Sequence, residues 1–324
     1  MKTRNYTYNT NEFHIHHIDQ LFYESDILFD IETTGLSPRN SHIYMIGLGY
    51  RIADSIHIKL FYASCKEEEP EILTAFIDTI KDYKRIITFN GDTFDLPFIK
   101  KRCEAKHILF DDYHLTSLDL FKLAKSYKRF LNLEHYKQKD LEHFFGIFRE
   151  DTFSGGELIE LYNRQALYPN DEEDDLLFLH NMEDIKGMVS LLSLLDFSTL
   201  ENLKPDVSDI SSNDKELTFS AKYEHPLNLS LTLLNRYGFI KLNDGMLFGS
   251  FNLYDGKMKY YLPNYKDYYY VEDEELLLPK ALKRTVNKER IRKATKEECF
   301  ILTDPALITP EKLSDYIKQL LNDK

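Results

Sequence analysis

Two carboxylates at the end of an apolar strand are the residues of this sequence whose types and spacing most clearly indicate chemistry. Asp30 and Glu32 close the segment DILFDIE (26–32), and residues i and i+2 of a strand point to the same face of a sheet. Two carboxylates side by side in a buried position are unfavourable unless a cation lies between them. A polar strand end beside the turn at Gly35 is the alternative, and we favour a divalent metal ion over it.

Two later segments supply further acids and an imidazole. Asp95 lies in FNGDTFDLPF (89–98), where Asn90 ends a strand and Asp95 opens a helix. Taken alone, Asp95 is more typical of a helix cap than of a metal ligand. His180 and Asp184 are four residues apart in an amphipathic segment and would share one face of a helix. For these two residues alone, a surface His–Asp pair is an equally good interpretation.

Taken together, the residues indicate a specific chemistry. Carboxylates from separate elements, with no cysteine among them, suit Mg²⁺ or Mn²⁺ rather than zinc. Four carboxylates can hold two such ions roughly 4 Å apart, which is the arrangement used for in-line hydrolysis of a phosphodiester. A neutral imidazole nearby can accept a proton from the attacking water. The sequence therefore predicts a site for two divalent ions.

The elements that must position these side chains follow from the hydrophobic pattern. Three apolar strands with short connections come first, at residues 26–32, 43–51 and 55–63. Such short connections make neighbouring strands antiparallel. A helix, a strand and a second helix follow at 70–83, 85–90 and 94–105. We therefore expect an α/β fold with a mixed β-sheet flanked by helices.

The composition changes near residue 200. Residues 197–215 are rich in Ser, Asp, Asn and Pro, which favours a linker. Short alternating runs punctuated by Asp-Gly dipeptides follow and indicate hairpins. We expect four parts: an N-terminal extension over 1–24, the α/β domain over 25–200, a linker over 201–215, and a small β-rich domain with a C-terminal helix over 216–324.

Three motifs resemble those of a known superfamily. DIETTGL (30–36), N-G-x-x-F-D (90–95) and H-x-x-x-D (180–184) resemble the three exonuclease motifs of the DEDD superfamily of 3′–5′ exonucleases. The segments ITFNGDTFDLPFI and LHNMEDI are most similar to the YprB-like branch, and the resemblance covers about residues 25–197. It implies a ribonuclease H-like fold and metal-dependent 3′–5′ hydrolysis of DNA or RNA from a single-stranded 3′ end.

The resemblance also implies a role for each residue of the site. Asp30 would bridge both ions, Glu32 and Asp184 would bind the first ion, and Asp95 would serve the second. His180 takes the place of the general base. In the Tyr-type branch a Tyr precedes the last Asp by four residues, whereas in the His-type branch a His precedes it by five. This chain has His at the Tyr-type spacing, so the role of His180 stays open.

Further positions of the motifs are candidates for contact with the substrate. Leu36 resembles an apolar wedge against the terminal base, and Thr33 and Asn90 resemble contacts to the substrate end. Ordinary turn residues are nearly as good an interpretation of these positions. For Asp119, at the end of another strand, a structural hydrogen-bond partner is the better interpretation.

A basic segment in the second domain is the best candidate for substrate contact outside the site. Residues 280–296 contain the densest positive charge of the chain, and Lys or Arg can bind phosphates while tyrosines stack on bases. The residues of this segment that we expect to contact the substrate are Lys283, Arg284, Arg290, Arg292 and Lys293. The tyrosine-rich segment 261–271 lies nearby in sequence. The alternative for its tyrosines is that they form the core of the β-rich domain. The alternative for the basic segment is a solvated loop.

Charge and cysteine usage limit the classes of protein. The formal net charge is −13, and residues 205–324 carry −1 of it. The negative total argues against a general basic coat for nucleic acid. Three dispersed cysteines indicate a reducing, cytoplasmic environment without a zinc module. We expect neither a signal peptide nor a membrane span. A non-catalytic nucleic-acid-binding module and a structure-selective endonuclease remain the alternative functions.

Overall fold

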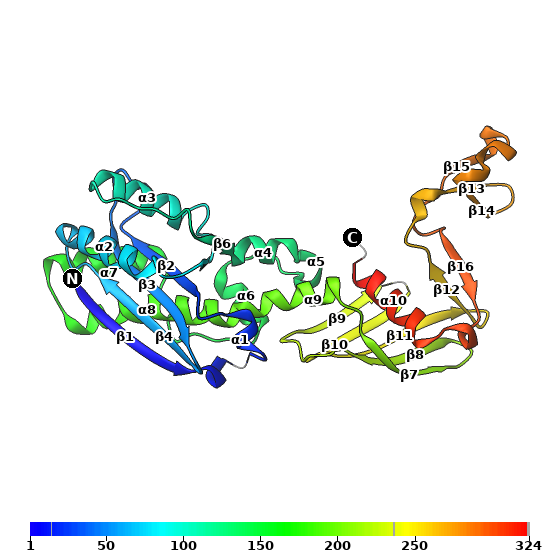
Figure 1. Ribbon diagram of the computed structural model, residues 1–324, viewed down its shortest axis with the longest axis horizontal. Helices are drawn as coiled ribbons and strands as arrows, with labels where there is room; N and C mark the ends of the chain where they lie inside the picture. Colours follow the sequence, from blue (N-terminus) through cyan, green and yellow to red (C-terminus); the bar gives the residue numbers. More distant parts are fainter. Residues whose placement is uncertain (14, 236, 323–324) are drawn as a thin grey trace. The chain divides into compact units, whose positions relative to one another are not determined.

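The chain folds into two compact units. The computed structural model describes residues 1–13, 15–235 and 237–322. The first unit is Met1–Phe197 and the second is Ser198–Lys324 (Figure 1). Within the described part of the chain, no helix has both the length and the apolar character that crossing a membrane requires.

A six-stranded mixed sheet forms the centre of the first unit. Its order is β1-β4-β3-β2-β5-β6. The strands are β1 (Lys2–Asn9), β2 (Asp26–Thr33), β3 (Ile43–Ile52), β4 (Ser55–Tyr62), β5 (Arg85–Thr88) and β6 (Thr116–Asp119). The pairs from β1 to β2 are antiparallel, whereas β5 pairs in parallel with both β2 and β6. The expected mixed sheet is confirmed.

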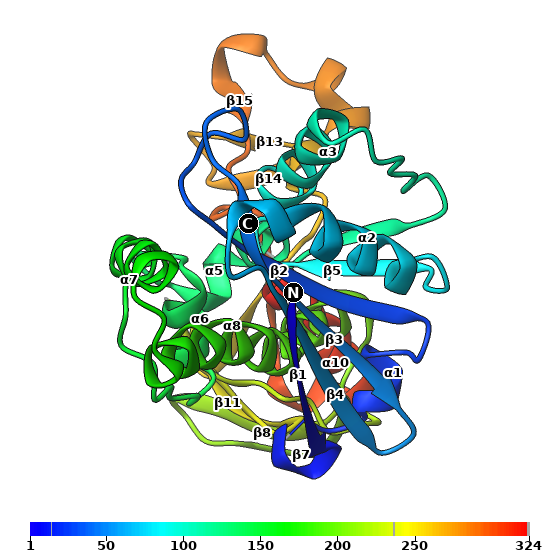
Figure 2. The same ribbon diagram turned by 90° about the vertical axis from the view of Figure 1, so that its left-hand side faces the viewer.

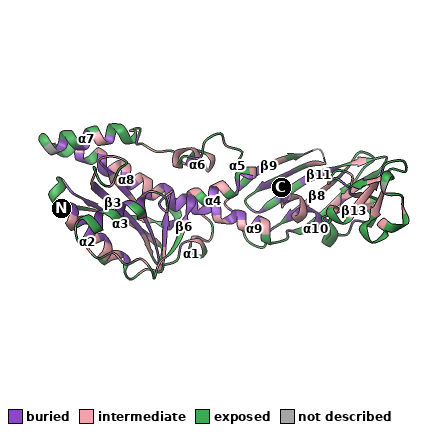
Figure 3. Ribbon diagram, turned by 90° about the horizontal axis from the view of Figure 1, so that it is seen from above, coloured by how far each residue is buried: buried purple, intermediate pink, exposed green. Residues whose placement is uncertain are grey.

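Helices cover both faces of this sheet (Figure 2). Helices α2 (Glu69–Ile80) and α3 (Asp95–Ala105) enclose the main hydrophobic core with β2, β3 and β5. The long helix α8 (Asp171–Leu191) packs on β2, β3 and β4 from the other side and contacts α6 (Gln138–Phe144) and α7 (Gly155–Leu167). The shorter helices are α1 (Ile18–Leu21), α4 (Leu120–Ser126), α5 (Lys128–Leu131) and α9 (Asp196–Asn202). Buried residues concentrate in the strands and in much of α8 (Figure 3).

A buried ion pair ties α2 and α3 to the sheet. Glu69 is fully buried and accepts from Arg102 Nε at 2.7 Å and from the Ile43 backbone N–H at 2.9 Å. Burial alone would raise the pKa of Glu69, but the Arg102 hydrogen bond and charge hold it below its usual range. The carboxylate therefore links two helices to β3.

The N-terminal residues differ from the expected extension. Residues 2–9 form the edge strand β1, which pairs with β4 along its whole length. Tyr8 donates a hydrogen bond to Met182 Sδ at 3.1 Å, which attaches the strand to α8. The segment KTRNYTYN is polar and only half-buried on one face, so it lacks the apolar alternation that marks the central strands.

The second unit is a β-rich domain, as expected. Its main sheet contains β16-β12-β11-β10-β9, with β8 paired to β11 and β7 paired to β8. These strands are β7 (Asp206–Ser212), β8 (Glu216–Lys222), β9 (Ser230–Asn235), β10 (Gly238–Asn243), β11 (Met246–Tyr254), β12 (Lys257–Tyr261) and β16 (Phe300–Thr303). Helix α10 (Pro310–Leu321) packs on β7. A small sheet contains β14 (Leu276–Pro279), β13 (Tyr268–Val271) and β15 (Ile291–Lys293).

Part of the expected linker is a strand. Residues 206–212 form β7, which pairs antiparallel with β8 and contains a register shift between Val207 and Asp209. Val207 is the only residue of β7 that is buried. An edge strand with one buried side chain leaves no periodic signal, so its Ser and Asp content resembles that of a linker.

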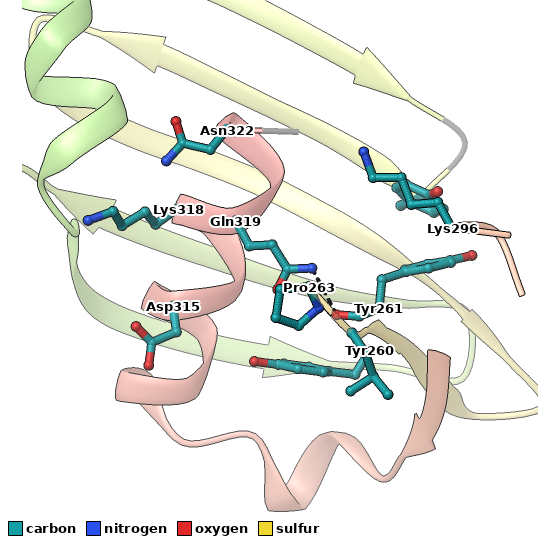
Figure 4. Close-up of a pocket in the computed structure, with 10 residues that line it drawn as sticks. Tyr260, Tyr261, Pro263, Lys296, Asp315, Lys318, Gln319 and Asn322 are labelled. Carbon is teal, nitrogen blue, oxygen red and sulfur yellow. Dashed lines mark hydrogen bonds between the residues drawn. The ribbon is translucent and has the colours of Figure 1, made fainter. Parts of the chain in front are cut away.

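A cavity of about 610 Å³ lies in the second unit between α10 and the end of β12 (Figure 4). Gln319 Nε2 donates to the Tyr261 carbonyl at 3.0 Å, and Lys318 donates to the Asn202 carbonyl. Asp315 forms an ion pair with Lys204 at 2.5 Å. These polar groups around the cavity are therefore bound to neighbours within the unit.

Candidate active site

Strand β2 carries the first two acids on the face opposite the main core. Ile27, Phe29 and Ile31 are buried in the hydrophobic cluster shared with α2 and α3. Because side chains alternate along a strand, Asp30 and Glu32 point to the other face. That face is covered by α8, which packs against β2 and β3. The strand therefore directs both carboxylates toward the helix.

Asp95 reaches the same place because β5 is short. The pairing of β2 with β5 stops at Leu28, so the next N–H on that side, from Ile31, has no strand partner. This N–H donates to Asp95 Oδ1 at 3.2 Å. Burial raises the pKa of Asp95 to about 7, although backbone N–H groups stabilise its charged form.

Helix α8 approaches the sheet closely because β3 has a glycine opposite Asp30. Gly47 pairs with Asp30, and a Cβ atom at this position would lie 2.1 Å from Asn181 Oδ1. With hydrogen in its place, Asn181 is fully buried and donates from Nδ2 to Asp30 Oδ2 at 2.8 Å. Asn181 therefore fixes the orientation of the central carboxylate.

His180 lies between the acids of β2 and α8. Its Nε2 atom is 3.4 Å from Glu32 Oε1 and 3.2 Å from Asp184 Oδ2. Its Nδ1 atom is 2.7 Å from Asp151 Oδ2, and Asp151 is held by Lys139 Nζ at 3.0 Å. Burial of the ring opposes its charge, but the Asp151 hydrogen bond and the neighbouring carboxylates prevail. The pKa of His180 is therefore raised to about 9.

A buried arginine orients the last acid. Arg149 Nη1 donates to Asp184 Oδ1 at 2.6 Å, and its remaining donors hold Glu142 at 2.5 and 2.6 Å. Gln138 Nε2 donates to the Asp184 carbonyl at 2.8 Å and to Glu142 at 2.9 Å. The Glu142 carboxylate occupies space above Gly187, where a Cβ atom would lie 1.9 Å from Oε1. This network fixes Asp184 from the side away from Glu32.

The structure thus brings all five predicted residues of the site together, at an electrostatic cost. Burial raises the pKa of Asp30 well above its usual range, and the charges of Asp184, Asp95 and Glu32 raise it further. Burial also raises the pKa of Glu32 to about 7, against the opposing effect of His180. Cations bound between these buried carboxylates would stabilise their ionised forms.

The donor set fits divalent ions. Glu32, His180 and Asp184 each offer a ligand atom, and these atoms lie within 4.8 Å of one another. Asp30 and Asp95 add carboxylates that interact electrostatically with this group. Oxygen ligands with one imidazole and no thiolate suit Mg²⁺ or Mn²⁺.

The candidate contacts for the substrate end differ in exposure. Leu36 is 86% exposed, as a wedge would have to be. Thr33 is buried and donates to the Gly35 carbonyl at 3.0 Å. Asn90 has a φ of 65° and accepts from the Thr93 hydroxyl at 2.7 Å. The Thr33 and Asn90 side chains therefore form turn hydrogen bonds.

Asp119 has a structural role where β6 ends and α4 begins. Its side chain accepts from the backbone N–H groups of Phe121 and Lys122 and so caps α4. It also accepts from the Asn90 N–H at 2.9 Å. It is a structural hydrogen-bond partner, as the sequence favoured.

Two arginines of the basic segment are engaged in ion pairs within the second unit. Arg290 Nε lies 2.6 Å from Asp273 Oδ2. Arg292 lies 2.5 Å from Glu298 Oε1 and 2.8 Å from Glu272 Oε1. All of these groups are partly exposed, which weakens such pairs, although Arg292 holds Glu298 through two donors.

The three other candidates of the segment, Lys283, Arg284 and Lys293, differ in their surroundings. Lys283 Nζ donates to the Tyr269 hydroxyl at 2.9 Å and lies 4.7 Å from the centre of that ring. Arg284 and Lys293 are exposed. The small three-stranded sheet therefore gathers the basic segment and part of the tyrosine-rich segment in one place.

Sequence reasoning missed the residues that support the site. Asp151 and Arg149 lie in an irregular segment between α6 and α7, and Glu142 lies on α6. Nothing in their local pattern distinguishes them from surface charges, because their partners are far away in the sequence. Asn181 could have been found from its place next to His180 in a helix that must pack on the sheet.

Comparisons with known proteins place the first unit in a family. Two DNA polymerases, from Thermococcus sp. (strain 9oN-7) and Thermococcus kodakarensis, are each 34% identical over 93 residues, which is 26% of this chain. The matched part is only 12% and 6% of the two polymerases. A solved family B DNA polymerase from Pyrobaculum calidifontis aligns with a TM-score of 0.45 and 16% identity, over 54% of this chain and 25% of that chain. The RNase_H superfamily profile matches residues 27–196, just over half of the sequence, and the chain therefore belongs to the RNase_H superfamily.

Proposed function

We propose that the first unit is a divalent-metal-dependent nuclease that hydrolyses single-stranded DNA or RNA from the 3′ end. The observation that carries this proposal is that four carboxylates, those of Asp30, Glu32, Asp95 and Asp184, come together beside strand β2. The pKa values of the first three are raised. Structural ion pairs do not account for such a cluster, because Arg149 neutralises only part of its charge.

In this proposal each side chain has a defined task. Asp30, oriented by Asn181, lies centrally and would contact both ions, while Glu32 and Asp184 would hold the first ion and Asp95 the second. His180 belongs to the same cluster, either as a proton acceptor or as an additional ligand. Ions bound there would polarise the phosphodiester and lower the pKa of the attacking water.

The nucleic-acid substrate is supported by the family and by the matched relatives. The two matched relatives are DNA polymerases, and the chain belongs to the RNase_H superfamily. The resemblance of the motifs to DEDD exonucleases of the YprB-like branch supports 3′–5′ polarity. Leu36 follows Glu32 by four residues and is exposed, which supports a stacking contact with a terminal base.

Degradation of labelled strands tests the proposal. Single-stranded DNA and RNA, labelled at either the 5′ or the 3′ end, would be incubated with Mg²⁺, Mn²⁺ or excess chelator. We expect a ladder that shortens from the 3′ end with either ion and no cleavage with chelator. Asp30→Asn should be inactive, whereas Asp171→Asn, an exposed acid at the start of α8, should retain activity.

The same experiment separates the alternatives. Internal fragments at early times would identify an endonuclease. Binding without cleavage under every ion condition would identify a non-catalytic module. Full activity in excess chelator, or in Asp30→Asn, would contradict the metal-dependent mechanism.

A further inference from the structure

The imidazole of His180 lies at the distance of a neighbouring metal ligand. Its Nε2 atom is 3.4 Å from Glu32 Oε1 and 3.2 Å from Asp184 Oδ2. Around an ion with ligands at about 2.1 Å, two ligands at right angles are roughly 3.0 Å apart. The ring therefore touches the two carboxylates assigned to the first ion in the way that a third ligand would.

The spacing along α8 supports the same interpretation. His180 and Asp184 are one helical turn apart, and both side chains point toward β2. Side chains at i and i+4 on one helix face are a recurrent way to bind a single ion, as in the H-E-x-x-H zinc motif. Glu32, from the facing strand, completes a group of three ligand atoms within 4.8 Å.

The other ring nitrogen is already in use. Nδ1 lies 2.7 Å from Asp151 Oδ2, and the Asp151 side chain is 1% exposed. Lys139 Nζ and the Phe153 backbone N–H, each at 3.0 Å, hold this carboxylate in place. Histidines that bind metals typically donate their second N–H to a carboxylate in this way, which fixes the tautomer and directs the free nitrogen at the ion.

We propose that His180 binds the first metal ion directly through Nε2, together with Glu32 and Asp184, and that Asp151 is the positioning residue for its ring. The inference rests on the proposed function in that divalent ions bind this cluster. A coordinated Nε2 cannot accept a proton from water, so the general base is another group. One nitrogen ligand among oxygens shifts the preference of the site from Mg²⁺ toward a transition metal such as Mn²⁺.

Pulsed electron paramagnetic resonance on the full chain with bound Mn²⁺ tests the coordination without reference to activity. A directly coordinated imidazole gives a magnetic coupling between Mn²⁺ and ¹⁴N. We expect this coupling in the wild-type protein and its loss in His180→Gln. The matched control is His135→Gln, because His135 is an exposed histidine outside the cluster, and it should keep the coupling.

Binding constants provide the second measurement. Mn²⁺ affinity should fall roughly 10- to 100-fold in Asp151→Asn, the effect usual for a residue that supports a metal ligand. The ratio of Mn²⁺ to Mg²⁺ affinity should decrease in His180→Gln. In Asp151→Asn, a weaker nitrogen coupling would identify a positioning role, since a merely structural change would leave the spectrum of bound Mn²⁺ unaltered.

The outcomes separate this inference from the proposed function. Bound Mn²⁺ without nitrogen coupling in the wild-type protein would overturn the inference, and it needs no variant to fold. Nitrogen coupling without any cleavage of nucleic acid would overturn the nuclease proposal and leave the metal site standing. A wild-type protein that does not bind Mn²⁺ would overturn both.

Discussion

Replacing Glu32 by Gln should stabilise the metal-free protein, although it should abolish metal-dependent cleavage. The carboxylate is largely buried beside Asp30, Asp95 and Asp184, and the charge of His180 is the largest influence that opposes the rise of its pKa. A neutral amide of the same shape removes the repulsion. The prediction therefore opposes the usual result that substitutions in a buried site destabilise.

The magnitude follows from the pKa of Glu32. It is about 7 in the folded protein, against an ordinary value of 4.5. Each tenfold difference in proton affinity corresponds to about 1.4 kcal/mol, so ionised Glu32 lowers the free energy of unfolding at pH 8 by on the order of 3 kcal/mol. This pKa already includes the attraction to His180, so the expected gain from the neutral amide at pH 8 is about 3 kcal/mol. For a unit of this size, that is a rise in melting temperature of roughly 6–12 °C.

The sign of the pH dependence is fixed by the direction of the shift. A carboxyl group with a raised pKa in the folded state has no effect below pH 4.5, where it is protonated in both states. Stability then falls as the pH rises from 4.5 through 7 and levels off above. The raised pKa of His180 acts in the same direction, because its contribution is lost between pH 6.5 and 9. The gain from Glu32→Gln should therefore be small at pH 5 and largest at pH 8.

Calorimetric melting in chelator, from pH 5 to pH 8, would test the reasoning. Glu160→Gln is the matched control, because Glu160 is an exposed residue of α7, and it should leave the melting temperature nearly unchanged. Mn²⁺ should stabilise the wild-type protein at pH 8 by mass action and should do so much less in Glu32→Gln. A melting temperature that falls at pH 8 in metal-free Glu32→Gln would refute the argument that the cluster is electrostatically strained without ions.

Three further results are expected. Asp30→Asn should abolish cleavage and should preserve or raise the melting temperature of the metal-free protein. Activity and calorimetry would be measured on one preparation. A fall in both the activity and the melting temperature would indicate simple unfolding. Glu69→Gln should lower the free energy of unfolding by about 3 kcal/mol or more, because it leaves a buried arginine unpaired. Because the pKa of Glu69 is lowered in the folded protein, the stability that this pair gives the wild-type protein should be lost as the pH falls through that pKa. Denaturant titrations at several pH values would measure this loss. If the variant were as sensitive to acid as the wild type, the ion pair would not be its source. Neutralising Arg290, Arg292 and Lys293 together should weaken the salt dependence of single-strand binding by roughly 0.7 per lost phosphate contact, and identical slopes for wild type and variant would show that these residues do not contact the strand.

The sequence predicted the candidate site better than the parts that support it, for a physical reason. Asp30 and Glu32 are informative because two carboxylates on one face of an apolar strand violate the local pattern. The support is different: Asp151 and Arg149 obey the local pattern of a polar loop, and only the packing of α8 on the sheet shows that they are buried. A single sequence carries no signal for such contacts, since they depend on residues about 30 positions away.

The strands that the sequence did not predict share another cause. β1 and β7 are edge strands, and the hydrogen bonds of their backbones to β4 and β8 hold them in place. Edge strands bury few side chains, so their composition is free to be polar. The central strands β2, β3 and β4 are buried on one or both faces, and their residue types reveal them directly.

The charges around the site bear on how an acidic unit could approach a polyanion. Most of the formal charge of −13 lies before residue 205. The fixed side-chain charge of the first unit therefore repels a phosphate backbone. Divalent ions would reverse the sign of the local potential at the carboxylate cluster. Binding of ions and binding of nucleic acid should thus reinforce each other, which would make a site this acidic compatible with the proposed nucleic-acid substrate.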